Sequence, residues 1–218
     1  MRYFIVISRG FVPHTDDNHS KRRRVLKKTI LLGGYGGQGV QTLGRLLAVA
    51  FSEAGKQVAF VPDYSGSMRG GISNCSLIIS DQPIGSPLLK DPDILIALNE
   101  GAKRAFENRI VPGGMLIYNT DIAKSPSERE DILAAGLPAN TLAEQCGSAK
   151  AANVVILAFF TRLSGMLPVE AMKKTVEREL NAAKPFLEDL NQRAFVAGIE
   201  AAEKSLRQTV FEPQQFGR

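Results

Sequence analysis

The sequence predicts an α/β fold, with a mainly parallel sheet, helices on both of its faces and a helical C-terminal part. From residue 28 onward, short apolar runs alternate with stretches of helical periodicity. Beyond residue 138 the pattern becomes wholly helical. Strands that alternate with helices form a parallel sheet with helices packed on both sides. The 218 residues suffice for one domain with a hydrophobic core that needs neither disulfides nor a metal.

The elements follow from periodicity and from glycine and proline positions. Residues 40–53 carry apolar side chains at helical spacing, and Pro62 is expected to end the strand before it. The strands are predicted at Thr29–Leu32, Gln57–Val61, Ser73–Ser80, Ile94–Leu98 and Met115–Tyr118. The later helices are predicted at Gly101–Arg109, Leu142–Gly147, Ala151–Leu163, Val169–Leu180 and Phe186–Leu206.

Charge divides the chain into an extension and a body. Residues 1–28 hold eight basic and two acidic residues, a net charge of +6, whereas the other 190 hold 19 basic and 20 acidic residues, a net charge of −1. We therefore expect a basic, flexible N-terminal extension at 1–27, a single domain at 28–210 and a tail at 211–218. A translation start placed too far upstream would give the same pattern. Because the body is neutral, no nucleic-acid partner is expected.

The residue inventory excludes several kinds of chemistry. His14 and His19 both lie in the extension, which rules out a Ser-His-Asp or Cys-His catalytic centre and a His-ligated zinc in the body. Cys75 and Cys146 are too few for an iron–sulfur cluster, which needs about four thiolates. We assign no catalytic residue and no metal ligand. Two cysteines, and no apolar run near the roughly 18 residues of a membrane span, predict a cytoplasmic protein without a membrane partner.

The clearest local motif is a glycine loop, Gly34-Tyr35-Gly36-Gly37-Gln38-Gly39, between the first predicted strand and helix. Glycines allow close approach to the backbone, and the free N–H groups of the helix start attract anions. This strand–loop–helix context is typical of a Rossmann-like fold, although a tight turn without a ligand gives the same pattern. The candidate binding residues here are Gly36, Gly37, Gln38, Gly39 and Thr42.

A second loop, residues 63–71, follows the second strand of the body and should meet the glycine loop at the carboxyl edge of the sheet. Its arginine could clamp a phosphate or carboxylate in bidentate fashion, or form a surface salt bridge. The candidate binding residues of this loop are Ser65, Arg69, Gly70 and Gly71. Cys75 alternates with apolar residues on the next strand, so we interpret it as a core residue.

A stand-alone NAD- or flavin-binding oxidoreductase is one function compatible with the glycine loop. The acid that binds the ribose is expected about 20 residues after the loop begins. Asp63 occupies the corresponding strand end, but it lies 29 residues after Gly34, and the body has no histidine to act as a proton donor.

Longer strings of residues resemble the gamma subunit of 2-oxoacid:ferredoxin oxidoreductases. The strings are GGYGGQGVQTLGRLLA, VPDYSGSMRGGISNCSLIIS, QPIGSPLLKDPDILIALN and PGGMLIYNT, with further likeness at Ala152–Leu157 and at Asn191, Ala194 and Gly198. The resemblance covers about residues 28–204. Many gamma subunits carry Pro-Glu where this chain has Gly66-Ser67, which puts the role of that glutamate in doubt here.

The resemblance implies an enzyme that decarboxylates a 2-oxoacid on thiamine diphosphate, reduces ferredoxin and releases an acyl-CoA. Because this chain lacks a Gly-Asp-Gly motif and a cluster motif, thiamine diphosphate, magnesium and the iron–sulfur clusters would lie on alpha, beta and delta (ferredoxin-like) partner subunits. The chain itself would carry no cofactor. It would help to form the site for coenzyme A, a substrate, or the wall of the catalytic pocket, through the glycine loop, Thr42 and Arg69.

The resemblance leaves the substrate and the role of the loops open. The MRGGISNC string resembles the 2-oxoglutarate or branched-chain group more than the pyruvate group, and we expect 2-oxoglutarate. A purely structural subunit, whose glycine loops only pack against a neighbour, is the remaining alternative.

Overall fold

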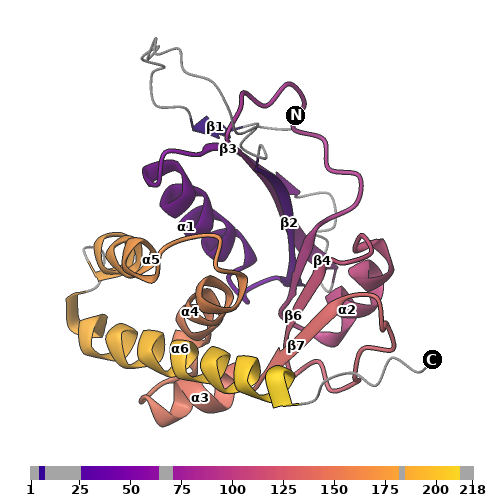
Figure 1. Ribbon diagram of the computed structural model, residues 1–218. Coiled ribbons are helices and arrows are strands. Elements are labelled where there is room, and N and C mark those ends of the chain that lie inside the picture. Colours follow the sequence, from indigo (N-terminus) through magenta and orange to yellow (C-terminus); the bar gives the residue numbers. More distant parts are fainter. Residues whose placement is uncertain (1–4, 8–25, 64–70, 182–184, 212–218) are drawn as a thin grey trace.

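Seven strands form one sheet in the order β1-β3-β4-β2-β5-β6-β7 (Figure 1). The computed structural model describes residues 5–7, 26–63, 71–181 and 185–211. The strands are β1 (Ile5–Ile7), β2 (Lys27–Tyr35), β3 (Gln57–Asp63), β4 (Ile72–Ser80), β5 (Ile94–Ala97), β6 (Met115–Asn119) and β7 (Leu133–Leu137).

Most of these strands run in the same direction. The neighbours β2, β5, β6 and β7 are parallel, whereas β4 is antiparallel to both β2 and β3. Because β4 is antiparallel to both of its neighbours, β3 runs in the same direction as β2. Among the described strands, only β1 and β4 run in the opposite direction. The mainly parallel sheet is therefore confirmed in the direction of its strands. The strand pairs from β1 to β2, however, are antiparallel, which the sequence prediction did not include.

The helices cover both faces of the sheet, as predicted. They are α1 (Val40–Glu53), α2 (Glu100–Phe106), α3 (Ala139–Gln145), α4 (Ala152–Ser164), α5 (Val169–Val176) and α6 (Glu188–Phe211). Helix α2 lies on one face, and α1, α4, α5 and α6 lie on the other (Figure 1). Single turns at 107–109, 149–151 and 185–187 are 3-10 helix, and residues 177–181 form a π-helix. The α/β fold with a helical C-terminal part is confirmed.

The larger apolar cluster lies between α1, α4 and the sheet. Phe51, Phe159 and Phe160 are almost wholly buried there, and burying a side chain of this size stabilises the fold by about 1.5–3 kcal/mol. Cys75 belongs to this cluster and is fully buried, which confirms it as a core residue; burial raises the pKa of its thiol. Gly44 of α1 is required here, because a Cβ would lie 2.5 Å from the Cys75 sulfur.

An aspartate ties the starts of β2 and β5 together. The carboxylate of Asp93 accepts hydrogen bonds from the Thr29 N–H (2.9 Å) and hydroxyl (2.8 Å) and from the Lys28 ammonium (2.7 Å). Burial alone would raise the pKa of Asp93, but these donors outweigh it and lower the pKa. The contacts set the two strands level, so that their carboxyl ends open at the same edge.

Several boundaries differ from the sequence prediction. Helix α1 matches it, but β3 continues through Pro62 to Asp63. Among the described residues, the pairing of β1 covers Val58–Phe60 and does not reach Pro62, and proline is tolerated where the ladder needs no N–H. Strand β7 was not predicted, since Leu-Ala-Ala-Gly-Leu has weak strand propensity. Residues 5–7 pair with β3, which differs from the expectation of a flexible extension at these three residues.

Candidate functional site

A cavity of about 250 Å³ opens where β2, β5 and β6 end. From β2 the chain crosses by α1 toward β3, and from β5 it crosses by α2 toward β6 on the opposite side. Ligands of open α/β sheets bind at such a switch point, beyond the carboxyl ends of the strands. The cavity is lined by Gly37, Gln38, Gly39, Leu98, Asn119, Ile122, Asn140, Ala149, Lys150, Ala152, Asn153 and Ile156.

The glycine loop is held by the side chain of Gln38. Its Oε1 accepts hydrogen bonds from the backbone N–H of Tyr35 (2.6 Å) and from Asn99 Nδ2 (2.7 Å). Asn99 is fully buried and also caps α2, because its Oδ1 accepts from the N–H of Ala102 at 2.8 Å. Gln38 therefore ties the loop after β2 to the helix after β5.

The first residues of α4 form the opposite wall. Asn153 Nδ2 donates to the carbonyl of Gln38 at 3.0 Å, across 115 residues of sequence. Gly39 has φ +77°, and a Cβ there would lie only 2.3 Å from Asn153 Nδ2. A glycine at 39 is therefore required both by its backbone conformation and by the approach of Asn153.

A pair of asparagines closes a third side. Asn119, at the end of β6, donates from Nδ2 to Asn140 Oδ1 at 2.7 Å. Its own Oδ1 accepts from the N–H groups of Asp121 (3.2 Å) and Ala139 (3.1 Å). Asn119 thereby fixes both the chain that leaves β6 and the start of α3.

The electrostatics of the lining favour an anion. Lys150 is the charged side chain among the lining residues, and no carboxylate is present among them. Helices α1 and α4 both begin at the cavity, and neither has an acidic residue in its first turn. Helix α1 has no capping side chain, whereas α4 continues the 3-10 turn at 149–151, whose start is capped by the Ser148 hydroxyl. The N–H groups at the start of α1 are thus not capped by a described side chain, and no carboxylate in the first turn of α1 or α4 offsets the positive end of either helix dipole.

The structure brings together part of the predicted binding set. Gly37, Gln38 and Gly39 line the cavity, and Gly36 lies beside them, exposed. Thr42 is exposed on α1 and does not line the cavity, and Gly71 lies half-buried before β4 at the same edge. Ser65, Arg69 and Gly70 lie outside the described residues.

Sequence reasoning missed the amides that complete the site, Asn99, Asn119, Asn140 and Asn153, together with Lys150. A signal for two of them was present, because an asparagine directly follows the apolar strands at 94–98 and 115–118. Strand β4 lies between β2 and β3, which places Asp63 two strands, about 10 Å, from the end of β2. That position disfavours Asp63 as the ribose ligand of a dinucleotide.

The fold and the site define a Rossmann-like chain whose glycine loop borders a donor-rich cavity at the switch point of the sheet. The family model described as "Pyruvate ferredoxin/flavodoxin oxidoreductase" matches residues 29–201, and the chain belongs to this family. The resemblance noted in the sequence is therefore confirmed.

Relatives include subunits of several 2-oxoacid oxidoreductases. The chain is 32% identical to ketoisovalerate oxidoreductase subunit VorA of Methanothermobacter marburgensis over 81% of its length, but it spans only 37% of that protein. It is 31% identical to 2-oxoglutarate synthase subunit KorC of Methanocaldococcus jannaschii, covering 85% of this chain and 99% of KorC.

Two solved structures share the fold. The gamma subunit of a keto/oxoacid ferredoxin oxidoreductase from Geobacter sulfurreducens PCA is 28% identical, with a TM-score of 0.70, over 81% of this chain and 99% of that chain. A 2-oxoglutarate:ferredoxin oxidoreductase from Magnetococcus marinus, solved with 2-oxoglutarate, coenzyme A and succinyl-CoA bound, has a TM-score of 0.74 at 22% identity. The match covers 82% of this chain and 31% of that one.

Within the described part of this chain, no helix is long and apolar enough to cross a membrane.

Proposed function

We propose that this chain is the gamma subunit of a thiamine-diphosphate-dependent 2-oxoacid:ferredoxin oxidoreductase, and that its cavity binds part of coenzyme A. Family membership supports the first half of the proposal, as does the full-length match to KorC. The observation that carries the second half is the cavity itself, which offers a lysine, the uncapped start of α1 and the positive end of α4, and has no carboxylate in its lining.

The glycine loop supports a ligand that approaches the backbone. Gly36 is exposed, its φ lies outside the left-handed region, and a Cβ on it would meet no described atom within 4 Å. Packing and backbone conformation therefore do not require glycine at this position, whereas they do at Gly39. A phosphate that rests against the loop would need the space that a side chain takes.

The size of the cavity indicates that it holds only part of the ligand. At about 250 Å³ it is smaller than the roughly 300–1,000 Å³ of sites that enclose a whole drug-sized molecule. We place a phosphate-bearing part of coenzyme A here and its thiol end toward a partner subunit. Thiamine diphosphate, magnesium and the iron–sulfur clusters lie on alpha, beta and delta partner subunits, and the complex passes electrons to ferredoxin in the cytoplasm.

We propose 2-oxoglutarate as the 2-oxoacid. The relatives also include enzymes named for ketoisovalerate and pyruvate, but KorC subunits match over most of their length, at 31% identity for two of them. The pyruvate synthase subunit PorC of Thermotoga maritima is 27% identical. Comparing kcat/KM for 2-oxoglutarate, pyruvate and 3-methyl-2-oxobutanoate in the assembled enzyme tests this choice; a preference for either of the last two contradicts it.

Lys150→Ala tests the coenzyme A site in the complex assembled with its partner subunits. Losing a charge-assisted contact of about 1.4 kcal/mol should raise the KM for coenzyme A about tenfold and leave the KM for the 2-oxoacid nearly unchanged. Lys174→Ala, an exposed lysine on α5, is the matched control. An unchanged KM for coenzyme A in Lys150→Ala would favour the purely structural subunit. Binding of NAD or a flavin by the isolated chain would favour the stand-alone oxidoreductase.

A further inference from the structure

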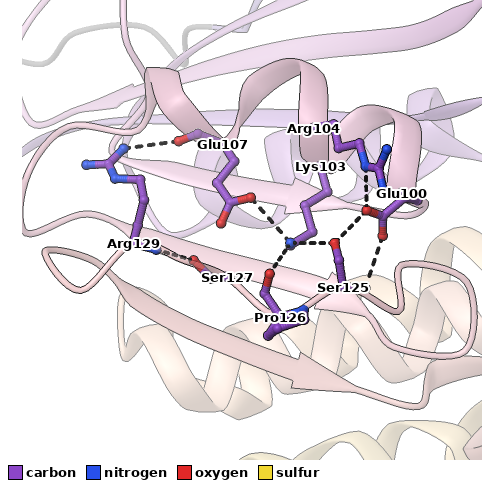
Figure 2. A network of polar contacts seen from close by, with 8 residues as sticks. All are labelled: Glu100, Lys103, Arg104, Glu107, Ser125, Pro126, Ser127 and Arg129. Carbon is purple, nitrogen blue, oxygen red and sulfur yellow. Dashed lines mark hydrogen bonds and ion pairs between the residues drawn. The ribbon is translucent and has the colours of Figure 1, made fainter.

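The connection between β6 and β7 is unusual for two parallel strands. Residues 120–132, here called the crossover segment, contain no helix, although parallel strands are commonly joined through one. The segment passes beside α2 on the face of the sheet opposite α1 and α4 (Figure 2). A segment without its own backbone ladder must be held by other contacts. At its start, Asp121 accepts hydrogen bonds from the N–H and hydroxyl of Thr141 in α3 (2.8 Å each), and from Ser125 onward the contacts come from α2.

The central contact is a buried lysine. Only 2% of the Lys103 side chain is exposed, and its ammonium donates to Ser125 Oγ at 3.1 Å and to the carbonyl of Pro126 at 2.9 Å. It also pairs with the carboxylate of Glu107, one turn along the helix, at 3.3 Å (Figure 2). Two of the three oxygens that Lys103 contacts thus belong to the crossover segment.

The carboxylate of Glu100 also binds Ser125. Glu100 accepts hydrogen bonds from the hydroxyl (2.5 Å) and the N–H (3.3 Å) of Ser125, and Arg104 pairs with it at 2.8 Å. The bond from Ser125, and then the one from Arg104, lowers the pKa of Glu100 to about 2. Further along, Arg129 donates to the carbonyls of Glu107 (3.1 Å) and Ile110 (2.7 Å) at the end of α2.

The other end of the segment forms a wall of the cavity. Ile122 lines the cavity and Ala123 is fully buried, and the N–H groups of both donate to the carbonyl of Asn119. Ile122 lies only three residues before Ser125, which limits their separation to about 10 Å. Only two residues separate them, so a shift at Ser125 has a short path to Ile122 and to its bond with Asn119.

We propose that Lys103 is a positioning residue for the cavity. It fastens Ser125 and Pro126 to α2 and so holds Ile122 and Asn119 where the ligand is bound. Lys103 touches neither the cavity nor its contents. The inference rests on the proposed function only for the identity of the ligand, because the contacts of Lys103 with Ser125 and Pro126 lie within this chain.

The test is the double variant Lys103→Met/Glu107→Leu in the assembled complex. Replacing both partners of a buried ion pair by apolar residues leaves no buried charge unpaired and is commonly tolerated. We expect amide hydrogen exchange at residues 120–131 to become about tenfold faster, with β5 unchanged. The KM for coenzyme A should rise about fivefold, while kcat stays within about twofold. Arg162→Met/Glu203→Leu, which removes an ion pair of the same 3.3 Å length on the opposite face, is the control.

The outcomes distinguish the positioning role of Lys103 from the proposed binding of coenzyme A. Unchanged exchange at 120–131, or faster exchange with an unchanged KM for coenzyme A, overturns the proposal. If the double variant does not fold, Ser125→Ala keeps the Lys103–Glu107 pair and the bond from Lys103 to the Pro126 carbonyl, and removes the bonds of the Ser125 hydroxyl to Lys103 and Glu100. It should show the same pattern at smaller amplitude, and wild-type behaviour would count against the proposal. If the complex does not use coenzyme A at all, the proposed function fails, whereas the exchange at Ile122 and Asn119 still decides whether Lys103 positions the wall.

Discussion

Amide side chains dominate the site at the residue scale. Gln38, Asn119, Asn140 and Asn153 each connect two segments that are distant in sequence, and each is a neutral group that can donate and accept. Because these amides are neutral, the charge that the cavity favours in a ligand depends on Lys150 and on the helix starts. The glycines beside these amides differ in their structural role. Packing requires a glycine at Gly39, where a Cβ would meet Asn153, but not at Gly36.

Gly39→Ala should destabilise the fold more than Gly55→Ala. Both glycines have a left-handed backbone, at φ +77° and +81°, so each substitution costs about 1–2 kcal/mol for conformation alone. Only at Gly39 would the new methyl meet Asn153, at 2.3 Å, whereas nothing lies within 4 Å of Gly55. We expect an extra loss of about 1–3 kcal/mol for Gly39→Ala in urea denaturation. Equal losses in the two variants would mean that the contact with Asn153 contributes nothing.

At the element scale, the antiparallel half of the sheet sets this chain apart from a purely parallel fold. Strand β4 is inserted between β2 and β3, so that β3 and β4 are adjacent and antiparallel, and β4 begins opposite Tyr35 of the glycine loop. The eight residues between β3 and β4 are too few for a parallel crossover, which takes a dozen or more. The loop length was thus a signal for the reversed strand.

The N-terminal strand gives a prediction at the same scale. Because Ile5–Ile7 pairs with Val58–Phe60, deleting residues 1–24 should remove an edge strand of the sheet, whereas deleting residues 1–4 should not. We expect the longer deletion to lower the free energy of unfolding by about 1 kcal/mol, which lowers Tm by roughly 2–4 °C in a domain of this size. Thermal denaturation of the two truncated chains measures the difference. Identical Tm values would show that β1 adds no stability and would support the original expectation of a flexible extension.

For the whole molecule, the cavity lies where the direction of winding changes, between the ends of β2 and β5. Helices α1 and α4 approach it from one face, and the crossover segment reaches it from the face covered by α2. The site therefore draws on most of the chain from Gly37 to Ile156, although it contains no histidine or carboxylate in its lining to carry out proton transfer. This lining agrees with the proposal that the cavity binds and positions part of coenzyme A.

The purified chain alone should catalyse no 2-oxoacid oxidation. We expect a colourless preparation that gains coenzyme A-dependent, 2-oxoacid-dependent dye reduction only when it is co-expressed with its partner subunits. Iron analysis and visible absorption of the isolated chain, followed by activity of the assembled complex, are the measurements. Stoichiometric iron in a homogeneous preparation of this chain would contradict the assignment of the clusters to the partners.

The sequence by itself determined the order of the elements apart from β1 and β7, the bounds of α1, the buried Cys75 and the family. These follow from local periodicity and from strings of adjacent residues, which can be read without knowing the tertiary structure. It also predicted the glycine loop as one side of a site, since the loop's chemistry is contained in six consecutive residues, Gly34–Gly39.

Only the tertiary structure decided which distant residues meet. Asn153 reaches Gln38 across 115 positions, and Lys103 holds Ser125 across 22, contacts for which no local pattern exists. Strand β7 was missed for a related reason, because its small residues form a strand only when β6 supplies the hydrogen bonds. The site is assembled by the way the strands line up, and strand order and direction are properties of the folded chain that local periodicity does not contain.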